Sequence, residues 1–456
     1  MATVPSTALD LDWDLTRTAG ALSGEIEDFD TGAWIRLSVT AGVSYQIYGD
    51  TDTLHGGEPR LEVCNAAGTV LAALDGTQRA APLSYTAGFT GTVYLHVDSF
   101  PAQFDVFVTT LPGTAASLTD ADDIYTGTAN QRIAGWIGHD TIQIGAGIDA
   151  LGGPGDDHLI GNAVANRIFG GLGDDRVEAG AGDDVVWGGE GVDVIRGEAG
   201  NDLVYGGAGG DGIDGGAGND RVFGGDGADL VFDTGGGDDI LSGDAGNDWI
   251  VGLDGNDILR GGAGADRLDG GGGFDTAMYS EATAGVGVNL AAGTGVGGIA
   301  QGDTLDAIEG VYGGSGNDGL IGSSTDNVLV GNAGNDVLIG LGGRDALAGG
   351  AGADRFTYGS VGQSPVGAGS DQITDFSHAQ GDRIDLVSID ARATVAGDQA
   401  FTFIGAAAFT HHAGELRAVS AGGVTSITGD VNGDAVADFQ IRATGTIAFV
   451  VADFVL

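Results

Sequence analysis

The feature that most constrains this chain is a nine-residue repeat. From Gly152 the sequence falls into nines such as GGLGDDRVE, GGEGVDVIR and GGAGNDRVF. The period slips by one residue at DTGGGDDILS and then resumes, and a second block runs from Gly313 to Thr357. A short fixed period is typical of a solenoid, in which each repeat buries its apolar side chains only against its neighbours.

Three kinds of position within each nine predict the local structure. The glycines at positions one, two and four are expected to adopt the positive φ angles of tight turns, which other residues avoid. The sixth position is almost always Asp, and the eighth is almost always aliphatic. A short strand with one inward apolar side chain therefore follows each turn. Two nines are expected to form one coil of a parallel β-solenoid whose strands stack about 4.8 Å apart.

Stacking the coils creates an electrostatic problem, because Asp residues 18 positions apart fall on the same side of successive coils. Two carboxylates about 5 Å apart repel by about 0.8 kcal/mol in water and about 3 kcal/mol at an effective dielectric constant of 20. Burial of one aliphatic side chain returns only about 1.5–3 kcal/mol before the entropy of ordering is subtracted. Without a cation, the repulsion between carboxylates outweighs the gain from aliphatic burial. A divalent cation between turns converts this repulsion into attraction. Oxygen ligands at flexible spacing suit Ca²⁺ better than Mg²⁺ or zinc, so the solenoid is predicted to depend on calcium.

Composition supports this interpretation and excludes others. The chain has 90 Gly among 456 residues and a net charge of −48, a composition typical of disorder, but 42% of its residues are apolar. The acidic charge argues against nucleic-acid binding, and the absence of Lys argues against a P-loop nucleotide enzyme. No run approaches the about 20 apolar residues of a transmembrane segment. The start lacks the pattern of a cleaved signal peptide, which predicts a cytosolic protein or export without an N-terminal signal.

The repeated G-G-x-G-x-D pattern resembles the RTX family of secreted calcium-binding proteins. The resemblance implies a parallel β-roll in which Ca²⁺ lies between consecutive turns, held by the repeat Asp carboxylates and by backbone carbonyls of the turns. Asn166 and Asn327 replace Asp in two copies, so weaker or empty half-sites are expected there. The implied ligands are Asp140, Asp157, Asp175, Asp184, Asp193, Asp202, Asp211, Asp220, Asp229, Asp239, Asp248, Asp257, Asp266, Asp275, Asp318, Asp336, Asp345 and Asp354.

The C-terminal part, from Tyr358, loses the nines. Its segments ITDFSHAQGDRIDL, GDQAFTFIG and AGELRAV resemble the C-terminal domain of serralysin-type proteases and related RTX proteins. The resemblance implies an uncleaved type I secretion signal, and the solenoid also needs a cap at this end. The segment DVNGDAVAD (430–438) has the oxygen spacing of a calcium loop, although a hairpin turn is favoured. Asp375, Asp382 and Asp385 are a further candidate for a final calcium site.

Two other regions complete an all-β organisation. Residues 279–311 break the period, with a strand predicted over 286–290 and the coil restarting near Ile308. Alternating runs at 34–39, 44–49, 60–65, 92–98 and 103–111 predict a β-sandwich, which weakly resembles bacterial pre-peptidase C-terminal-like domains. The predicted domains are a sandwich (1–113), roll block 1 (114–278), a β insert (279–312), roll block 2 (313–357) and a C-terminal cap (358–456).

The sequence predicts a non-enzymatic function. It contains no His-Glu-x-x-His zinc motif and no G-x-S-x-G nucleophile motif, and the repeat explains the paired carboxylates. We therefore predict a secreted protein that folds on Ca²⁺ outside the cell and acts non-catalytically at the cell surface or in the extracellular matrix. Two alternatives remain: a calcium-dependent self-assembling surface-layer or filament subunit, and a glycan-binding adhesin that uses the N-terminal sandwich. The predicted partners are calcium and the type I secretion machinery.

Overall fold

The computed structural model describes residue 135, residues 138–145, 149–393 and 395–456, and the strands between residues 33 and 134. The chain divides into two compact units, residues 1–160 and 161–456. The described residues form β-strands joined by turns and contain no α-helix, which confirms the predicted all-β class. Short 3-10 helices occur at η2 (Gly298–Ala300), η3 (Val361–Gln363) and η4 (Val451–Asp453).

In the first unit, the strands of residues 33–111 form two antiparallel sheets, ordered β1-β6-β3-β4 and β5-β2-β7. Two such sheets are what a sandwich requires, but the side chains that would pack between them lie outside the described residues. Further along, β8, β10 and β12 pair in parallel, as do β9 and β11. The strands are β1 (Ala33–Val39), β2 (Ser44–Gly49), β3 (Arg60–Cys64), β4 (Val70–Leu74), β5 (Leu83–Thr86), β6 (Gly91–Asp98), β7 (Val106–Leu111), β8 (Ile124–Thr126), β9 (Arg132–Ala134), β10 (Thr141–Gln143), β11 (Asp149–Pro154) and β12 (His158–Asn162).

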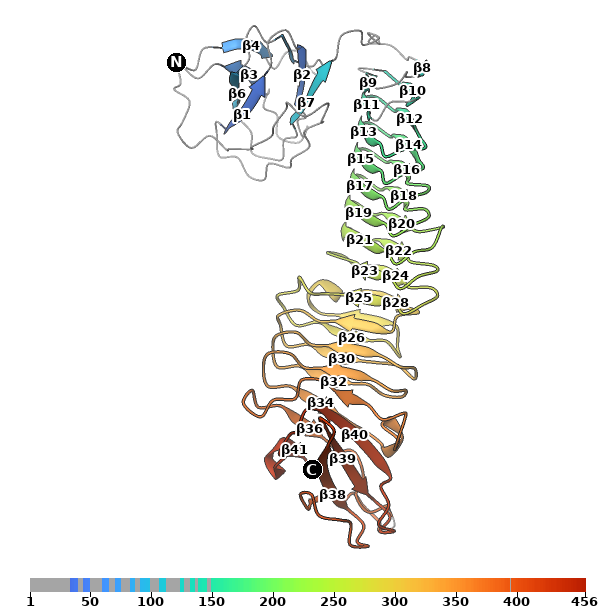
Figure 1. Cartoon of the computed structure of the whole chain (residues 1–456), viewed down its shortest axis with the longest axis vertical. Helices are drawn as coiled ribbons and strands as arrows, with labels where there is room; N and C mark the ends of the chain where they lie inside the picture. The colour runs from blue at the N-terminus through green and yellow to red at the C-terminus, as the bar shows by residue number, and fades with distance from the viewer. Residues whose placement is uncertain are drawn as a thin grey trace. The chain divides into compact units, whose positions relative to one another are not determined.

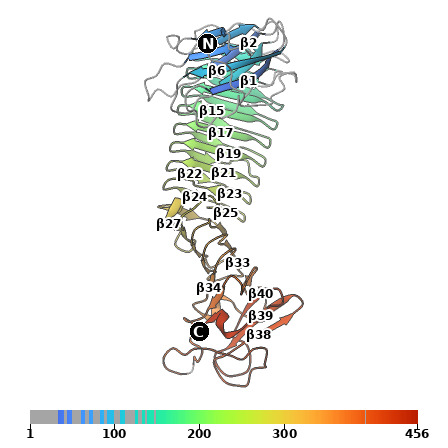
Figure 2. The same ribbon diagram turned by 90° about the vertical axis from the view of Figure 1, so that its left-hand side faces the viewer.

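The second unit is a solenoid of stacked coils in which successive strands alternate between two parallel sheets (Figure 1). Turning the view by 90° shows the strands of successive coils lying one above another (Figure 2). Val185 pairs with Leu203, 18 residues later, so one coil is two nines, as predicted. Sheet I contains β14 (Arg176–Gly180), β16 (Val194–Arg196), β18 (Gly212–Asp214), β20 (Leu230–Phe232), β22 (Trp249–Val251), β24 (Arg267–Asp269), β28 (Thr304–Asp306), β30 (Gly319–Ile321), β32 (Val337–Ile339), β34 (Arg355–Thr357) and β36 (Arg383–Asp385). Sheet II contains β13 (Arg167–Leu172), β15 (Val185–Glu190), β17 (Leu203–Ala208), β19 (Arg221–Asp226), β21 (Ile240–Ala245), β23 (Ile258–Arg260), β25 (Thr276–Met278), β29 (Gly310–Tyr312), β31 (Val328–Val330), β33 (Ala346–Ala348) and β35 (Gln372–Ile373).

The core is one column of aliphatic side chains from each sheet. The eighth residue of each nine is the centre of a short strand, where the side chain points inward while its two neighbours face outward. These side chains have no exposed surface, which confirms the predicted inward position. They include Ile195, Val204, Ile213, Val222, Val231, Leu241, Ile250, Leu259 and Leu268.

The turns follow the predicted conformation at positions two and four. Gly207 has φ 117° and Gly209 has φ 146°, and the same pattern recurs in most nines. Some nines hold another residue at position two. Leu253 has φ 66° there, a left-handed conformation that costs a side chain about 1–2 kcal/mol.

Two irregularities interrupt the 18-residue register. At the ten-residue repeat, Arg221 pairs with Ile240, so that coil has one extra residue. In the segment that breaks the period, β26 (Gly287–Asn289), β27 (Thr294–Val296) and β28 form an antiparallel meander inserted in sheet I. Because β28 already pairs in parallel with β24, the coil resumes by Thr304, slightly before the predicted restart at Ile308.

The C-terminal part covers the last coil of the solenoid. Strand β41 (Phe454–Val455) pairs with β36 of sheet I, and β40 (Phe439–Thr444) pairs with β35 of sheet II. Strands β38 (Glu415–Ala421) and β39 (Val424–Asp430) continue from β40 as an antiparallel meander, and β37 (Thr402–Phe403) pairs with β38. Both sheet edges at this end are therefore paired, as a cap requires.

Candidate metal centres along the roll

The sixth-position Asp side chains form two rows, one for each sheet, inside the turns of the solenoid. In each row the backbone N–H of one Asp donates to Oδ1 of the Asp in the next coil. Asp193 donates to Asp211 over 2.8 Å, and Asp202 donates to Asp220 over 2.7 Å. This bond recurs from Asp175 to Asp266 in the first row and from Asp184 to Asp275 in the second.

In most of these carboxylates the second oxygen has no hydrogen-bond partner. The Asp side chains are almost completely buried, and so are these Oδ2 atoms. A buried carboxylate oxygen without a partner is strongly unfavourable, so a row of them is suited to bind a cation. The Oδ2 atoms concerned belong to Asp184, Asp193, Asp202, Asp211, Asp220, Asp229, Asp239, Asp248, Asp257, Asp266, Asp275, Asp336, Asp345 and Asp354.

The position-one glycines leave room beside these oxygens. A Cβ added to Gly206 would come within 2.6 Å of Asp211 Oδ2, and it would come even closer to the carbonyl oxygen of Gly224 in the next coil. A carboxylate oxygen and a backbone carbonyl oxygen therefore converge where this residue has no side chain. Gly206 does not have a positive φ, so the expected conformational reason for glycine at position one is wrong. The reason is steric.

Burial also sets the protonation of the rows. It raises the pKa of Asp202 and of Asp211 to about 7. The negative charges of neighbouring carboxylates in the same row also raise these pKa values, whereas the N–H donated from the preceding coil lowers them. Desolvation likewise raises the pKa of Asp193 to about 6. A proton and a metal cation would thus compete for the same oxygens.

The donor set fits Ca²⁺. Each turn offers carboxylate and backbone carbonyl oxygens, and neither row contains His or Cys. Hard oxygen donors in a flexible loop are the ligands that Ca²⁺ takes, whereas zinc prefers nitrogen and sulfur. A bound cation would supply the positive charge that the Oδ2 atoms lack.

Other predicted ligands make the same bond between successive coils. Asp140 donates its N–H to Asp157 Oδ1 over 2.8 Å. In the second block, Asp318 donates to Asp336 and Asp336 donates to Asp354. Asn166 and Asn327 occupy row positions, where each side-chain carbonyl oxygen accepts an N–H from its own turn. The weaker half-sites expected at these two residues stay a prediction.

The rows also include acids outside the regular nines. Asp266 donates to Asp303 Oδ1, Asp275 donates to Glu309, and Asp345 donates to Asp371 Oδ1. Burial raises the pKa of Asp371 to about 8, although hydrogen bonds with Ser364 and Tyr358 oppose the rise. In the sequence each of these acids precedes an aliphatic residue by two positions, as in Asp-x-Leu or Asp-x-Ile. That signal could have identified them without the glycines.

The two C-terminal candidates differ from the rows. Residues 430–438 connect β39 and β40 as a hairpin, the favoured interpretation. Both oxygens of Asp430 accept backbone N–H groups of the loop. Asp375 accepts the N–H groups of Gly349 and Gly350, and Asp385 pairs with Arg355 over 3.2 Å. Asp382 instead continues the first row, because its Oδ1 accepts the N–H of Asp354 over 3.2 Å.

Two protein families match parts of the chain. The RTX calcium-binding nonapeptide repeat family matches overlapping stretches between residues 151 and 277, and the Peptidase M10 serralysin C terminal family matches residues 267–456. No curated protein sequence matches the chain. Among solved structures, the AlgE6R3 subunit from the Azotobacter vinelandii mannuronan C5-epimerase is 27% identical, with 32% of this chain and 71% of that chain covered and a TM-score of 0.20. The catalytic unit of a GH87 alpha-1,3-glucanase from Streptomyces thermodiastaticus is 11% identical, with 80% and 94% covered and a TM-score of 0.21.

The repeat matches and the buried Asp rows lead to the same conclusion about cations, namely that the roll binds several Ca²⁺ ions. No helix in the described part of the chain has the length and hydropathy needed to span a membrane. The chain thus contains RTX calcium-binding nonapeptide repeats, followed by a C-terminal part that matches the serralysin C-terminal family.

Proposed function

We propose that the chain is exported unfolded, folds outside the cell on binding Ca²⁺, and acts non-catalytically at the cell surface or in the extracellular matrix. The proposal rests on the two rows of buried Asp side chains, whose Oδ2 atoms have no partner without a cation. In the ligand-free state the rows oppose folding, because burial and mutual repulsion disfavour the ionised carboxylates. The fold is therefore favoured only where calcium is plentiful.

The difference in calcium concentration between the inside and the outside of the cell determines whether the chain folds. Extracellular modules bind Ca²⁺ with dissociation constants of about 10⁻⁴–10⁻³ M, far above cytosolic levels. At ten times the dissociation constant, one site adds about 1.4 kcal/mol to the free energy of unfolding. Ten independent sites would add more than about 10 kcal/mol, as much as the whole stability of an ordinary domain. The same chain can thus be unfolded inside the cell and stable outside.

The non-catalytic role is supported by how the described acids are used. The repeat carboxylates form the two rows, where Oδ1 accepts a backbone N–H and Oδ2 faces the proposed cation sites. No pair among them stands apart from the rows as a general acid and a general base would. The pocket lined by Leu290, Ser323, Leu341 and Gln363 contains no titratable side chain. The matched C-terminal family is named for a protease, but the chain has no His-Glu-x-x-His motif. Casein incubated with the full chain, calcium and zinc should remain intact, and cleavage would contradict the proposal.

Export is testable with the full chain in a bacterium that carries a type I secretion system. The resemblance to serralysin-type C-terminal domains implies an export signal that includes residues 453–456, so a variant that lacks these residues should accumulate inside the cell. The matched control is Val436→Ala, at an exposed position of the hairpin loop, which should be exported normally. Equal export of the truncated and full-length chains would contradict the proposed route.

A self-assembling subunit is the second candidate, favoured by an apolar stripe on sheet I. Leu230 and Trp249 pair on the outer face of neighbouring strands, and Val194 lies two strands before Leu230, with Gly212 between them; the three apolar side chains are 39–44% exposed. Light scattering in millimolar calcium distinguishes the candidates: a monomer supports the first, and growing particles abolished by Trp249→Ser support the second. The glycan-binding alternative depends on residues 1–113, whose side chains lie outside the described part of the chain. Glycan-array binding by the full chain tests it.

A further inference from the structure

The ten-residue repeat contains an acid where almost every other nine has glycine. Asp233 takes position one of this repeat and follows β20 of sheet I. Its side chain is completely buried. Asp220 and Asp239 precede β19 and β21 of sheet II and belong to the second row. One carboxylate oxygen from each of these three residues lies within 4.8 Å of the other two.

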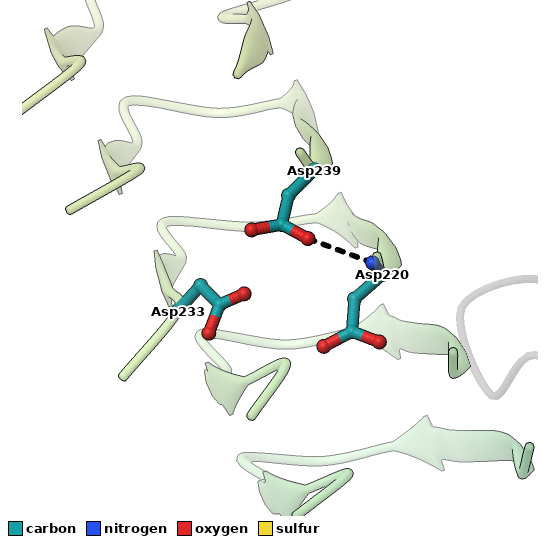
Figure 3. Close-up of side chains that lie close together, drawn as sticks. All are labelled: Asp220, Asp233 and Asp239. Carbon is teal, nitrogen blue, oxygen red and sulfur yellow. Dashed lines mark hydrogen bonds between the residues drawn. The ribbon is translucent and has the colours of Figure 1, made fainter. Parts of the chain in front are cut away.

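The three carboxylates point toward one another, with Asp233 reaching in from the sheet I end of the turn (Figure 3). Each uses Oδ1 to accept a backbone N–H: Asp239 from Asp220, Asp220 from Asp202, and Asp233 from Gly235 over 2.9 Å. The Oδ2 atoms of all three are buried and have no hydrogen-bond partner. The cluster thus contains three unsatisfied oxygens of one sign, which is the arrangement that a cation would neutralise.

The backbone beside the cluster also differs from that of a regular turn. At Gly206 an added Cβ would meet Asp211 Oδ2 and the carbonyl oxygen of Gly224 in the next coil. At Gly215, one nine later, the three nearest atoms all belong to Asp220, at 3.0–3.5 Å. The carbonyl oxygen of Asp233, which occupies the place equivalent to Gly224, is not among them. The Asp233 carbonyl oxygen thus lies farther than 3.5 Å from this point, whereas the Asp233 carboxylate lies in the cluster.

The extra residue of this repeat is held in place by its own contacts. Thr234 donates its N–H to Asp214 Oδ1 over 3.1 Å, and its hydroxyl lies 3.0 Å from both oxygens of the same carboxylate. These bonds fix the turn immediately after Asp233. The turn that carries the Asp233 side chain is therefore held by hydrogen bonds through Thr234 and through the N–H of Gly235.

We propose that Asp220, Asp233 and Asp239 form a three-carboxylate site for one Ca²⁺ ion, which binds more tightly than the regular sites of the roll. A regular site combines carboxylates with backbone carbonyls, whereas here a full negative charge replaces a carbonyl dipole. Affinity in calcium loops rises with the number of charged ligands. We expect the first equivalent of calcium to bind at least about tenfold more tightly than the rest. The proposal deepens the calcium binding of the roll and depends on it.

The test is a calcium titration of the full chain in competition with a chromophoric chelator of micromolar affinity. Asp233→Gly restores the residue that the neighbouring nines carry, so the variant should retain the roll. Asp233→Asn retains the shape of the side chain and removes its charge. Both variants should lose one tight equivalent, keep the weaker ones, and reach the wild-type circular dichroism spectrum at saturating calcium. The control Asp226→Asn removes an exposed charge nearby and should keep the tight equivalent.

Two results would overturn the proposal. Either the wild-type chain shows no equivalent tighter than the rest, or the isotherms of the two Asp233 variants superimpose on that of the wild type. Both differ from a failure of calcium binding by the roll, in which the wild-type chain would take up no calcium at all.

Discussion

The position-one glycines give a prediction whose size follows from the structure. In Gly206→Ala the new Cβ would come within 2.6 Å of Asp211 Oδ2, and closer still to the Gly224 carbonyl oxygen, so the backbone or the Asp side chain must move. Gly212→Ala is the matched control, because Gly212 lies in the same coil and its nearest neighbour would be the Asp193 carbonyl oxygen at 3.9 Å. Neither glycine has a positive φ, so the comparison isolates the steric effect.

Two contributions set the expected loss in Gly206→Ala. Overpacking of a tight site costs about 1–3 kcal/mol. Loss of one calcium site removes about 1.4 kcal/mol more at ten times its dissociation constant. We expect a decrease of about 2–4 kcal/mol in the free energy of unfolding in calcium, against a change within about 0.5 kcal/mol for Gly212→Ala.

Urea unfolding of the full chain in saturating calcium, followed by circular dichroism, measures both values. A calcium titration should show one equivalent fewer for Gly206→Ala and an unchanged number for Gly212→Ala. If the two variants lose equal stability and bind equal amounts of calcium, the steric account of position one is wrong.

Three further predictions concern the rows, the core and the turns. Because burial raises the pKa of Asp193 to about 6 and that of Asp202 to about 7, the calcium-free roll should be most stable below about pH 4 and lose stability as the pH rises through 6–7. In calcium the dependence should reverse, since protons displace the cation; parallel dichroism curves with and without calcium would contradict this. Ile213→Ala should cost about 2–5 kcal/mol in urea unfolding, and the exposed control Val194→Ala should stay within about 0.5 kcal/mol. Leu253→Gly should raise the urea midpoint by relieving a left-handed backbone worth about 1 kcal/mol, and a lowered midpoint would refute the strain.

The sequence predicted the roll well, because twice its repeat length is the spacing at which strands of successive coils pair. A nine-residue period with one aliphatic residue per repeat leaves few arrangements other than coils of 18 residues, and the pairing of Val185 with Leu203 confirms it. The N-terminal strands were also predictable, since β1, β2, β3, β6 and β7 follow the alternating runs. The sandwich packing and the domain boundaries stay predictions.

The rest depended on side-chain direction, which a repeat pattern does not show. The one-residue slip was visible in the sequence, but nothing in it showed that Asp233 turns inward to join Asp220 and Asp239. Asp303 and Asp371 do not stand out in the Gly-rich pattern, because their coils retain only the acid and the aliphatic residue two positions later. The role of the position-one glycines was missed for a similar reason, because a close approach between coils is not encoded within one nine.

The central claim is that cations in the Asp rows hold the roll together. The most direct test is the circular dichroism spectrum of the full chain, first in a calcium chelator and then in millimolar Ca²⁺, with millimolar Mg²⁺ as the control cation. The account predicts little ordered structure in the chelator, a cooperative gain of β-structure in calcium, and no comparable gain in magnesium. A chain with the same β-spectrum in chelator as in calcium would contradict it.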